Sequence, residues 1–178
     1  NFNASTSLPT GWTTAQLESE RPADRVWRCD NPGGQYVSGG NFSGNFAIYD
    51  GSYGGYVTDP NVKTHLTTPV IDCSDHTNVT LAFDIYFSDY NYNHVAANVQ
   101  VSNDGTNWTV IKNYTTYLGP EFVSFDISEY AAGKSNVQIR WYWDAYACYY
   151  AIDNVQLLSF TDQPLPVTLT TPANNAEN

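Results

Sequence analysis

The feature that most constrains the fold is a series of short segments in which apolar side chains occupy every second position. In residues 81–87 the apolar side chains fall on one face of an extended chain, because side chains alternate sides along a strand. Further segments of this kind occupy residues 97–112, 123–127, 137–143 and 151–157. Clusters of Gly, Pro, Asn and Asp separate them. The pattern predicts an all-β protein, an antiparallel β-sandwich with jelly-roll topology.

Local turn and helix signals refine this prediction. Residues 97–112 form an expected hairpin, because Asp104 and Gly105 supply turn chemistry between two extended runs. Ser128 to Gly133 can form one helical turn that ends at the glycine, and Thr14 to Glu20 is a second helical candidate.

The domain organisation follows from the polar, proline-containing end of the chain. Residues 1–160 carry all the strand patterns, whereas residues 161–178 include Pro164 and Pro166 in a polar run. We expect a jelly-roll domain over 1–160 and a linker, or the start of a following domain, over 161–178. The chain begins at Asn1 rather than Met, which suggests a processed chain or one module of a longer secreted or surface protein.

Charge and composition exclude several classes of function. Lys and Arg total 7 against 18 Asp and Glu, which gives a net charge of −11. Nucleic acids and anionic membranes are therefore poor partners, since both are bound through basic residues. Aromatic residues make up 15% of the chain, which excludes an acidic disordered chain. No apolar run is long enough for membrane insertion.

Catalytic patterns are missing from the sequence. His65, His76 and His94 lie outside any nucleophile-elbow or zinc-protease motif. The few glutamates do not fall in convincing buried strands, although carboxylate pairs form in space rather than in sequence. We expect no enzyme activity in this domain, while another domain of the parent protein could be catalytic.

Two loops rich in aromatic residues are candidates for a ligand-binding face. One contains Tyr90 and Tyr92, and the other contains Trp143, Asp144 and Tyr146. Sugar rings stack on exposed aromatic faces while polar side chains bind their hydroxyl groups. The alternative is that these aromatic residues cap the edge of the sandwich. Trp141, by contrast, shares a strand face with Val137 and Ile139 and is expected in the core.

Aspartates near strand ends are candidate ligands for Ca²⁺, which takes six to eight oxygen ligands from loops of loose geometry. Asp153 stands inside the apolar run 151–157, where a carboxylate is costly unless it is paired or bound to a metal. The alternative is that its side chain simply points outward.

Cysteine usage is less informative: of Cys29, Cys73 and Cys148, at most one pair can form a disulfide, and Cys29 with Cys148 is the pair we consider.

Several segments, in their order, resemble a known group of jelly rolls. They are Leu8-Pro9-Thr10-Gly11-Trp12, the strand start at residues 65–72, Val-Gln-Val-Ser-Asn-Asp-Gly-Thr-Asn-Trp at 99–108, and the last strands at 137–141 and 151–155. Together they resemble the MAM-like domains of bacterial secreted proteins, which include the cleaved-adhesin (gingipain haemagglutinin) domains.

The resemblance implies a two-sheet jelly roll that serves adhesion, carbohydrate binding or protein binding, often with structural calcium. In the related domains calcium joins positions that fall here on Asn3, Asp24 and Asp153, although Asn3 stands where an acidic residue is usual. Asp50 is added only because it precedes a glycine in a loop. We expect a secreted or surface-attached module that binds polysaccharide or glycan. The alternative is a protein–protein adhesion module, with a surface or matrix protein as partner and no sugar site.

Overall fold

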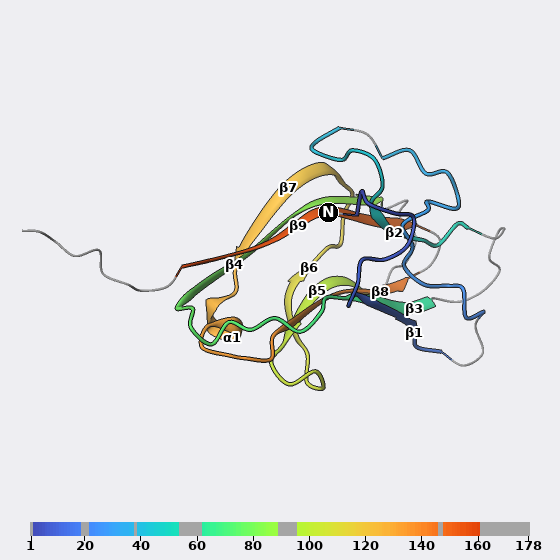
Figure 1. Cartoon of the computed structure of the whole chain (residues 1–178). Coiled ribbons are helices and arrows are strands. Elements are labelled where there is room, and N and C mark those ends of the chain that lie inside the picture. The colour runs from blue at the N-terminus through green and yellow to red at the C-terminus, as the bar shows by residue number, and fades with distance from the viewer. Residues whose placement is uncertain are drawn as a thin grey trace, which may run out of the picture.

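The computed structural model describes residues 2–18, 22–37, 39–53, 62–88, 96–145 and 148–160, and it forms two antiparallel sheets that face each other (Figure 1). The five-stranded sheet has the order β1-β3-β8-β5-β6 and the four-stranded sheet the order β2-β9-β4-β7. The elements are β1 Thr13–Gln16, β2 Ala47–Asp50, β3 Val62–Thr67, β4 Asn78–Ser88, β5 Ala96–Ser102, β6 Thr109–Asn113, β7 Leu118–Asp126, α1 Ser128–Ala131, β8 Gln138–Ala145 and β9 Tyr149–Phe160. The predicted antiparallel β-sandwich with jelly-roll topology is confirmed.

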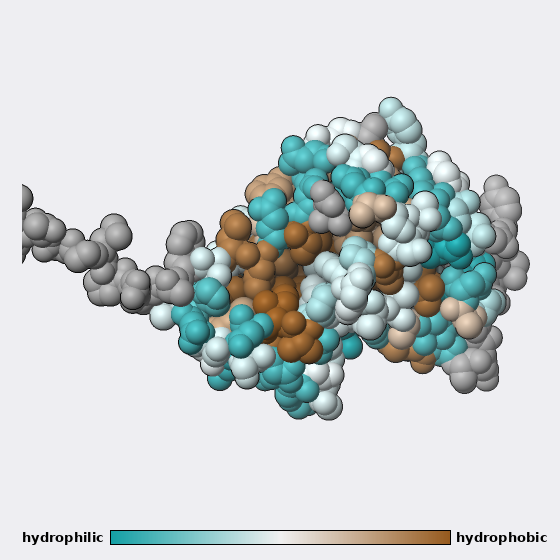
Figure 2. Space-filling model, in the orientation of Figure 1, coloured by the Kyte–Doolittle hydropathy of each residue, from teal (hydrophilic) through white to brown (hydrophobic). Residues whose placement is uncertain are grey.

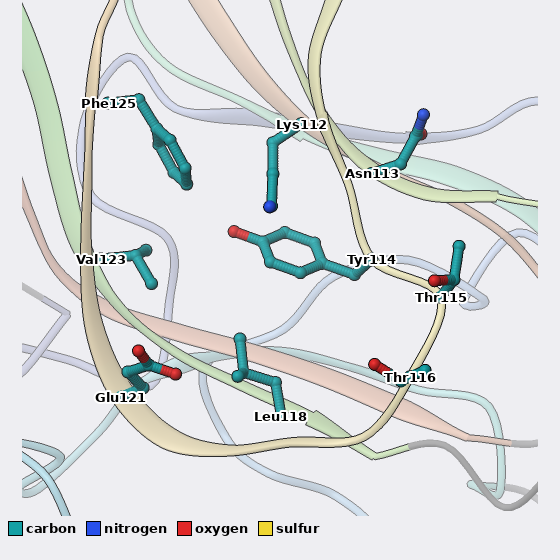
Figure 3. A pocket seen from close by; sticks show the side chains of 9 residues that line it. All are labelled: Lys112, Asn113, Tyr114, Thr115, Thr116, Leu118, Glu121, Val123 and Phe125. Atoms are coloured by element: carbon teal, nitrogen blue, oxygen red, sulfur yellow. The ribbon is translucent and has the colours of Figure 1, made fainter.

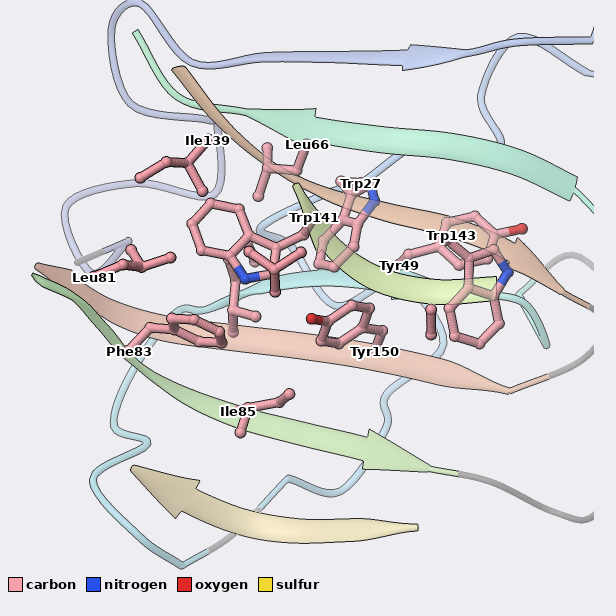
Figure 4. Packing of buried hydrophobic residues seen from close by; sticks show 14 of the residues in the cluster. Trp27, Tyr49, Leu66, Leu81, Phe83, Ile85, Ile139, Trp141, Trp143 and Tyr150 are labelled. Carbon is pink, nitrogen blue, oxygen red and sulfur yellow. The ribbon is translucent and has the colours of Figure 1, made fainter. Parts of the chain in front are cut away.

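The core lies between the two sheets and includes many aromatic side chains (Figure 4). Strand β8 contributes Trp141 and Trp143, and strand β4 contributes Phe83 from the opposite sheet. The ring of Phe83 meets that of Trp141 edge to face, with 5.2 Å between ring centroids. Edge-to-face contacts of this kind add to the free energy gained from burying the rings. The predicted core position of Trp141 is confirmed.

Local turn chemistry fixes the expected hairpin and one helical turn. Strands β5 and β6 pair across a turn in which Gly105 takes a positive φ of 73°. The carboxylate of Asp104 accepts hydrogen bonds from the backbone N–H groups of Thr106 and Asn107, at 2.8 and 2.7 Å. Helix α1 follows β7, and Gly133 adopts φ 70° shortly after it ends. The hairpin and this helical turn are therefore confirmed.

The expected second helix, Thr14 to Glu20, is wrong. Residues Thr13–Gln16 form strand β1, which pairs antiparallel with β3. The hydroxyl of Thr14 donates to the backbone carbonyl of His65 at 2.8 Å, so its side chain ties β1 to the sheet. Pairing with a neighbouring strand outweighs the local preference of a segment this short.

Cys29 and Cys148, the pair considered for a disulfide, are not bonded to each other. Both side chains are buried in the hydrophobic core as thiols, where they pack as small apolar groups. Cys73 is likewise a buried thiol. Burial raises the pKa of Cys29 to about 11, which keeps this thiol protonated and unreactive.

The two outer faces of the sandwich differ in how they are covered. On the four-stranded sheet, Val37, Phe42 and Phe46 from the segment before β2 pack on residues of β2 and β9, including Ile48 and Tyr149. This segment covers the part of that outer face formed by β2 and the start of β9. Among the described residues, no helix has the length and apolar character needed to cross a bilayer. The predicted linker at 161–178 lies outside the described residues.

Candidate functional site

The outer face of the five-stranded sheet carries a set of polar and aromatic side chains that we call the polar face. Strand β8 positions its centre, because Ile139, Trp141 and Trp143 point into the core and the residues between them point outward. The polar face comprises Lys63, His65 and Thr67 of β3, Asn98 and Gln100 of β5, Trp108 before β6, and Gln138, Arg140, Tyr142 and Asp144 of β8.

Strand register arranges these side chains in rows across the sheet. Residues directly opposite each other in an antiparallel sheet share a face. The rows are Thr67–Arg140–Gln100, then His65–Tyr142–Asn98, and then Lys63–Asp144–Ala96. The middle strand β8 therefore places a guanidinium, a phenol and a carboxylate two residues apart along one line, with amide and hydroxyl groups on both sides.

Arg140 is held in a fixed position on this face. Its Nε donates to Oε1 of Gln100 at 2.5 Å, and Nε2 of Gln100 donates to Oδ1 of Asn98 at 2.7 Å. The guanidinium carbon lies 4.1 Å from the ring centroid of Trp108 and 5.6 Å from that of Tyr142. Stacking and hydrogen bonding of this kind orient a guanidinium before a ligand arrives.

The charge of Arg140 is available to a ligand. Burial lowers the pKa of Arg140, yet an arginine remains protonated at any physiological pH. Within the described ranges, no carboxylate forms an ion pair with it. A partly buried, oriented cation with no carboxylate partner is suited to binding hydroxyl or carboxylate oxygens.

His65 adds a neutral donor and acceptor beside Tyr142. Its Nδ1 and the hydroxyl of Thr67 lie 2.9 Å apart and share a hydrogen bond. Burial of the ring, and then the nearby charge of Arg140, lower the pKa of His65 to about 4. The ring is therefore neutral at neutral pH and offers one donor and one acceptor nitrogen.

Asp144 is the predicted ligand-binding residue that the structure places on the polar face. Its Oδ2 lies 4.0 Å from Nζ of Lys63, which is also 4.0 Å from Oε1 of Glu18. This ion-pair group belongs to the third row, which is the row farthest from Arg140 along β8. Tyr90, Tyr92 and Tyr146, the other predicted tyrosines, lie outside the described residues.

Trp143 does not belong to a ligand-binding loop, and that prediction is wrong. Its side chain is 0% exposed, and its Nε1 donates to the carbonyl of Ala145 at 3.1 Å. Its ring packs against those of Tyr49 and Phe87 between the two sheets. Strand β8 continues to Ala145, so Trp143 keeps the inward direction of Trp141 two residues earlier.

Asp153, a predicted calcium ligand, lies under the N-terminal segment. It is 0% exposed, and its Oδ1 accepts from the backbone N–H of Phe2 at 3.4 Å. Its Oδ2 has no hydrogen-bond partner, and burial raises the pKa of the carboxyl group. The side chain leaves the sheet on the side away from the core, but chain packed over it makes it buried. A carboxylate in this state requires a cation, a proton or a donor.

A second buried carboxylate, Asp84, stands opposite Asp153 in the β4–β9 register. It accepts hydrogen bonds from the amide groups of Asn41, at 3.0 Å, and Asn154, at 2.8 Å. Asn3 directly follows Phe2 in the chain. Its Oδ1 lies so close to Gly44 that a Cβ added at this glycine would be 2.5 Å from it. The sequence signal for Asp84 was its place in the run 81–87, at an outward position of a strand that pairs with 151–157.

The other two predicted calcium ligands have different partners. Asp50 is buried, and its carboxylate accepts from Nε2 of Gln35 at 3.0 Å and from the backbone N–H of Ser52 at 2.9 Å. Asp24 is exposed; the hydrogen bond to Asp30 is the main cause that raises the pKa of Arg28, and the charge of Asp24 is a smaller one. In the part of the chain that the structure describes, no three His, Cys, Asp or Glu side chains converge as a metal site.

Comparison with solved structures gives the fold. The K1 cleaved adhesin domain of Lys-gingipain from Porphyromonas gingivalis W83 matches with a TM-score of 0.62 and 18% identity, over 89% of this chain and 95% of that domain. The K3 domain of the same protein matches with a TM-score of 0.56 and 20% identity, over 84% and 92%. This chain has the fold of the cleaved adhesin domains. The predicted resemblance is therefore confirmed at the level of the fold.

A carbohydrate-binding module has a related fold. TmCBM61, solved in complex with β-1,4-galactotriose, matches with a TM-score of 0.50 and 10% identity, over 85% of this chain and 90% of that one. No protein-family model matches the sequence, and no curated protein matches it.

Sequence reasoning missed most of the polar face. Arg140, Tyr142, Gln100 and Asn98 occupy the outward positions of strands that the alternating pattern had identified. The alternation itself is a usable signal, because Tyr142 directly follows Trp141 and therefore falls on the opposite face of the strand. It could not show that β3, β8 and β5 lie side by side.

Proposed function

We propose that this domain is a non-catalytic module that binds polysaccharide through the polar face. The observation that carries the proposal is the group of oriented side chains around Arg140. Partly exposed rings of Trp108 and Tyr142 flank the guanidinium, and Gln100 and Asn98 are already hydrogen bonded beside it. Each sugar ring presents C–H groups to an aromatic ring and hydroxyl groups to fixed donors and acceptors, which is the chemistry of this row.

Preorganisation is the physical advantage of this arrangement. Long polar side chains lose conformational freedom when they bind a ligand, and that loss reduces affinity. The contacts from Arg140 through Gln100 to Asn98 restrict these side chains before the sugar binds. His65, in the row next to that of Arg140, is neutral. A ligand that binds there therefore does not have to desolvate a second charged side chain.

The fold of TmCBM61, which was solved with β-1,4-galactotriose, supports a polysaccharide as ligand class without identifying the sugar. A carbohydrate-binding module is itself non-catalytic, in agreement with the missing catalytic motifs. A secreted or surface location is the setting in which such a module meets polysaccharide, and we propose it for the parent protein.

The test is a glycan array followed by titration of the full chain with the best-bound glycan. Tyr142→Ala removes an aromatic ring from the polar face, and Tyr36→Ala is its matched control, since Tyr36 is 81% exposed in the segment before β2. We expect Tyr142→Ala to lower affinity at least about tenfold, equivalent to about 1.4 kcal/mol, while Tyr36→Ala binds normally. Failure of the unaltered protein to bind any glycan would overturn the proposal.

One observation favours the alternative, a protein adhesion module without a sugar site. Phe122 of β7 is 49% exposed and Leu158 of β9 is 46% exposed, both on strands of the four-stranded sheet. An exposed aromatic side chain such as Phe122 is of the kind that is enriched in protein interfaces. If the unaltered protein binds a matrix protein but no glycan, and Phe122→Ser no longer binds that matrix protein, this function is favoured over the first.

Calcium is a separate part of the proposal. The unpartnered Oδ2 of Asp153 and the carboxylate of Asp84 opposite it are hard oxygen ligands of the kind Ca²⁺ prefers, and Asn3 can add an amide oxygen. We propose that these residues would hold a structural Ca²⁺ that ties the N-terminal segment to β9 and β4. Asp24 and Asp50 are not needed for it. Metal analysis of the purified protein, together with thermal melting in calcium and in EDTA, tests this.

A further inference from the structure

A pocket of about 380 Å³ opens between β6 and β7, which are edge strands of different sheets. In the space-filling view the surface between these strands is hollowed and apolar (Figure 2). Leu118, Val123 and Phe125 form apolar walls, and the remaining lining residues are polar: Lys112, Asn113, Tyr114, Thr115, Thr116 and Glu121 (Figure 3). Its volume falls in the range of small-molecule sites, and it lies apart from the polar face.

Tyr114 carries the strongest sign that the pocket has a ligand. The side chain is only 6% exposed, and its hydroxyl is buried without a hydrogen-bond partner. In Figure 3 this hydroxyl points into the space between Lys112 and Val123. Burial, with a smaller effect from the charge of Glu121, raises the pKa of Tyr114, so the hydroxyl keeps its proton as a donor. A buried polar group without a partner is unfavourable, and a ligand acceptor would satisfy it.

Charges of opposite sign stand on opposite sides of Tyr114. Nζ of Lys112 lies 5.9 Å from the ring centroid of Tyr114, on the side away from Glu121 (Figure 3). Within the described residues, neither Lys112 nor Glu121 forms an ion pair. The pocket therefore offers a cation and a hydroxyl donor on one side and an anionic acceptor on the other, with Val123 between them, Phe125 near the cation and Leu118 near the anion (Figure 3).

We propose that this pocket binds a small aromatic carboxylate with a hydroxyl group at its far end. The carboxylate accepts hydrogen bonds from Lys112 and from the Tyr114 hydroxyl. The ring packs against Leu118, Val123 and Phe125. The ligand hydroxyl donates to Glu121. The charge of the carboxylate matters: a neutral ester in its place cannot form the charged contact with Lys112.

The experiment is an NMR titration of the full chain with 4-hydroxycinnamate, with its methyl ester as the neutral probe. We expect saturable binding of 4-hydroxycinnamate and affinity for the methyl ester at least about tenfold lower. Lys112→Gln should weaken 4-hydroxycinnamate binding about tenfold, whereas the control Lys134→Gln, at another exposed lysine, should not change it.

Tyr114→Phe separates a ligand-binding role from a structural one. It removes only the unpartnered hydroxyl, so the melting temperature should stay the same or rise while affinity falls about fivefold. Glu121→Gln should reduce the preference for 4-hydroxycinnamate over cinnamate. Absence of saturable binding by the unaltered protein, equal affinity for the methyl ester, or unchanged affinity in both Lys112→Gln and Tyr114→Phe would each overturn the proposal.

Discussion

Trp143→Ala and Tyr142→Ala change neighbouring aromatic residues of β8, and we expect the first to reduce stability and the second to reduce glycan binding. Trp143 is completely buried, contacts the rings of Tyr49, Phe87 and Tyr150, and donates a hydrogen bond to Ala145. Truncating a buried tryptophan to alanine costs about 3–5 kcal/mol in unfolding free energy, because a cavity remains. For a domain of this size each kcal/mol lowers the melting temperature by roughly 2–4 °C.

Trp143→Ala should therefore melt roughly 8–16 °C lower than the unaltered protein, taking about 4 kcal/mol as the loss. Tyr142 points out of the sheet, so Tyr142→Ala should change the melting temperature by no more than about 3 °C and should weaken glycan binding instead. Thermal unfolding followed by circular dichroism, with glycan titration below the melting range, measures both effects. A Trp143→Ala protein that melts normally but no longer binds glycan would refute the assignment of Trp143 to the core.

Three further predictions concern buried polar groups. The pKa of His65 is lowered from 6.5 to about 4, so the unfolded chain binds more protons between these values and unfolding free energy should fall as pH drops from 6.5 to 4. The loss should be about 1–3 kcal/mol after screening of the partly exposed ring, and His65→Gln should flatten this part of a pH series of denaturant titrations. Asp153→Asn should lower the melting temperature in calcium but not in EDTA; equal loss in both would contradict the calcium proposal. A thiol reagent should find three reactive cysteines per chain in denaturant and react only slowly with the native protein, because all three are buried; fewer than three in denaturant would indicate a disulfide.

The strands and their inward faces could be predicted because they depend on a local regularity. In 81–87 and 137–143 the apolar residues recur at every second position, and the pleat of a strand converts this spacing directly into one buried face. The same rule placed Trp141 correctly. Trp143 belongs to the same alternating run, and its assignment to a ligand-binding loop was wrong because strand β8 continues to Ala145.

The helix expected at Thr14 to Glu20 shows where local reasoning reaches its limit. Nothing within this segment indicates that β3 offers it an unpaired edge, yet four residues of pairing with β3 decide its conformation. The buried state of Asp153 has the same origin. Its position in strand β9 is visible in the sequence, but the chain that covers it comes from Phe2, 151 residues away.

The sequence by itself determined the sandwich class, the faces of the main strands, the acidic charge and the missing catalytic motifs, because each depends on composition or on nearest neighbours. Only the tertiary structure decided which side chains meet: Thr67, Arg140 and Gln100 in one row, and Lys112 and Glu121 across one pocket. These groupings depend on strand order and register. Strand order and register are fixed by packing the whole core, and no single segment of the chain carries that information.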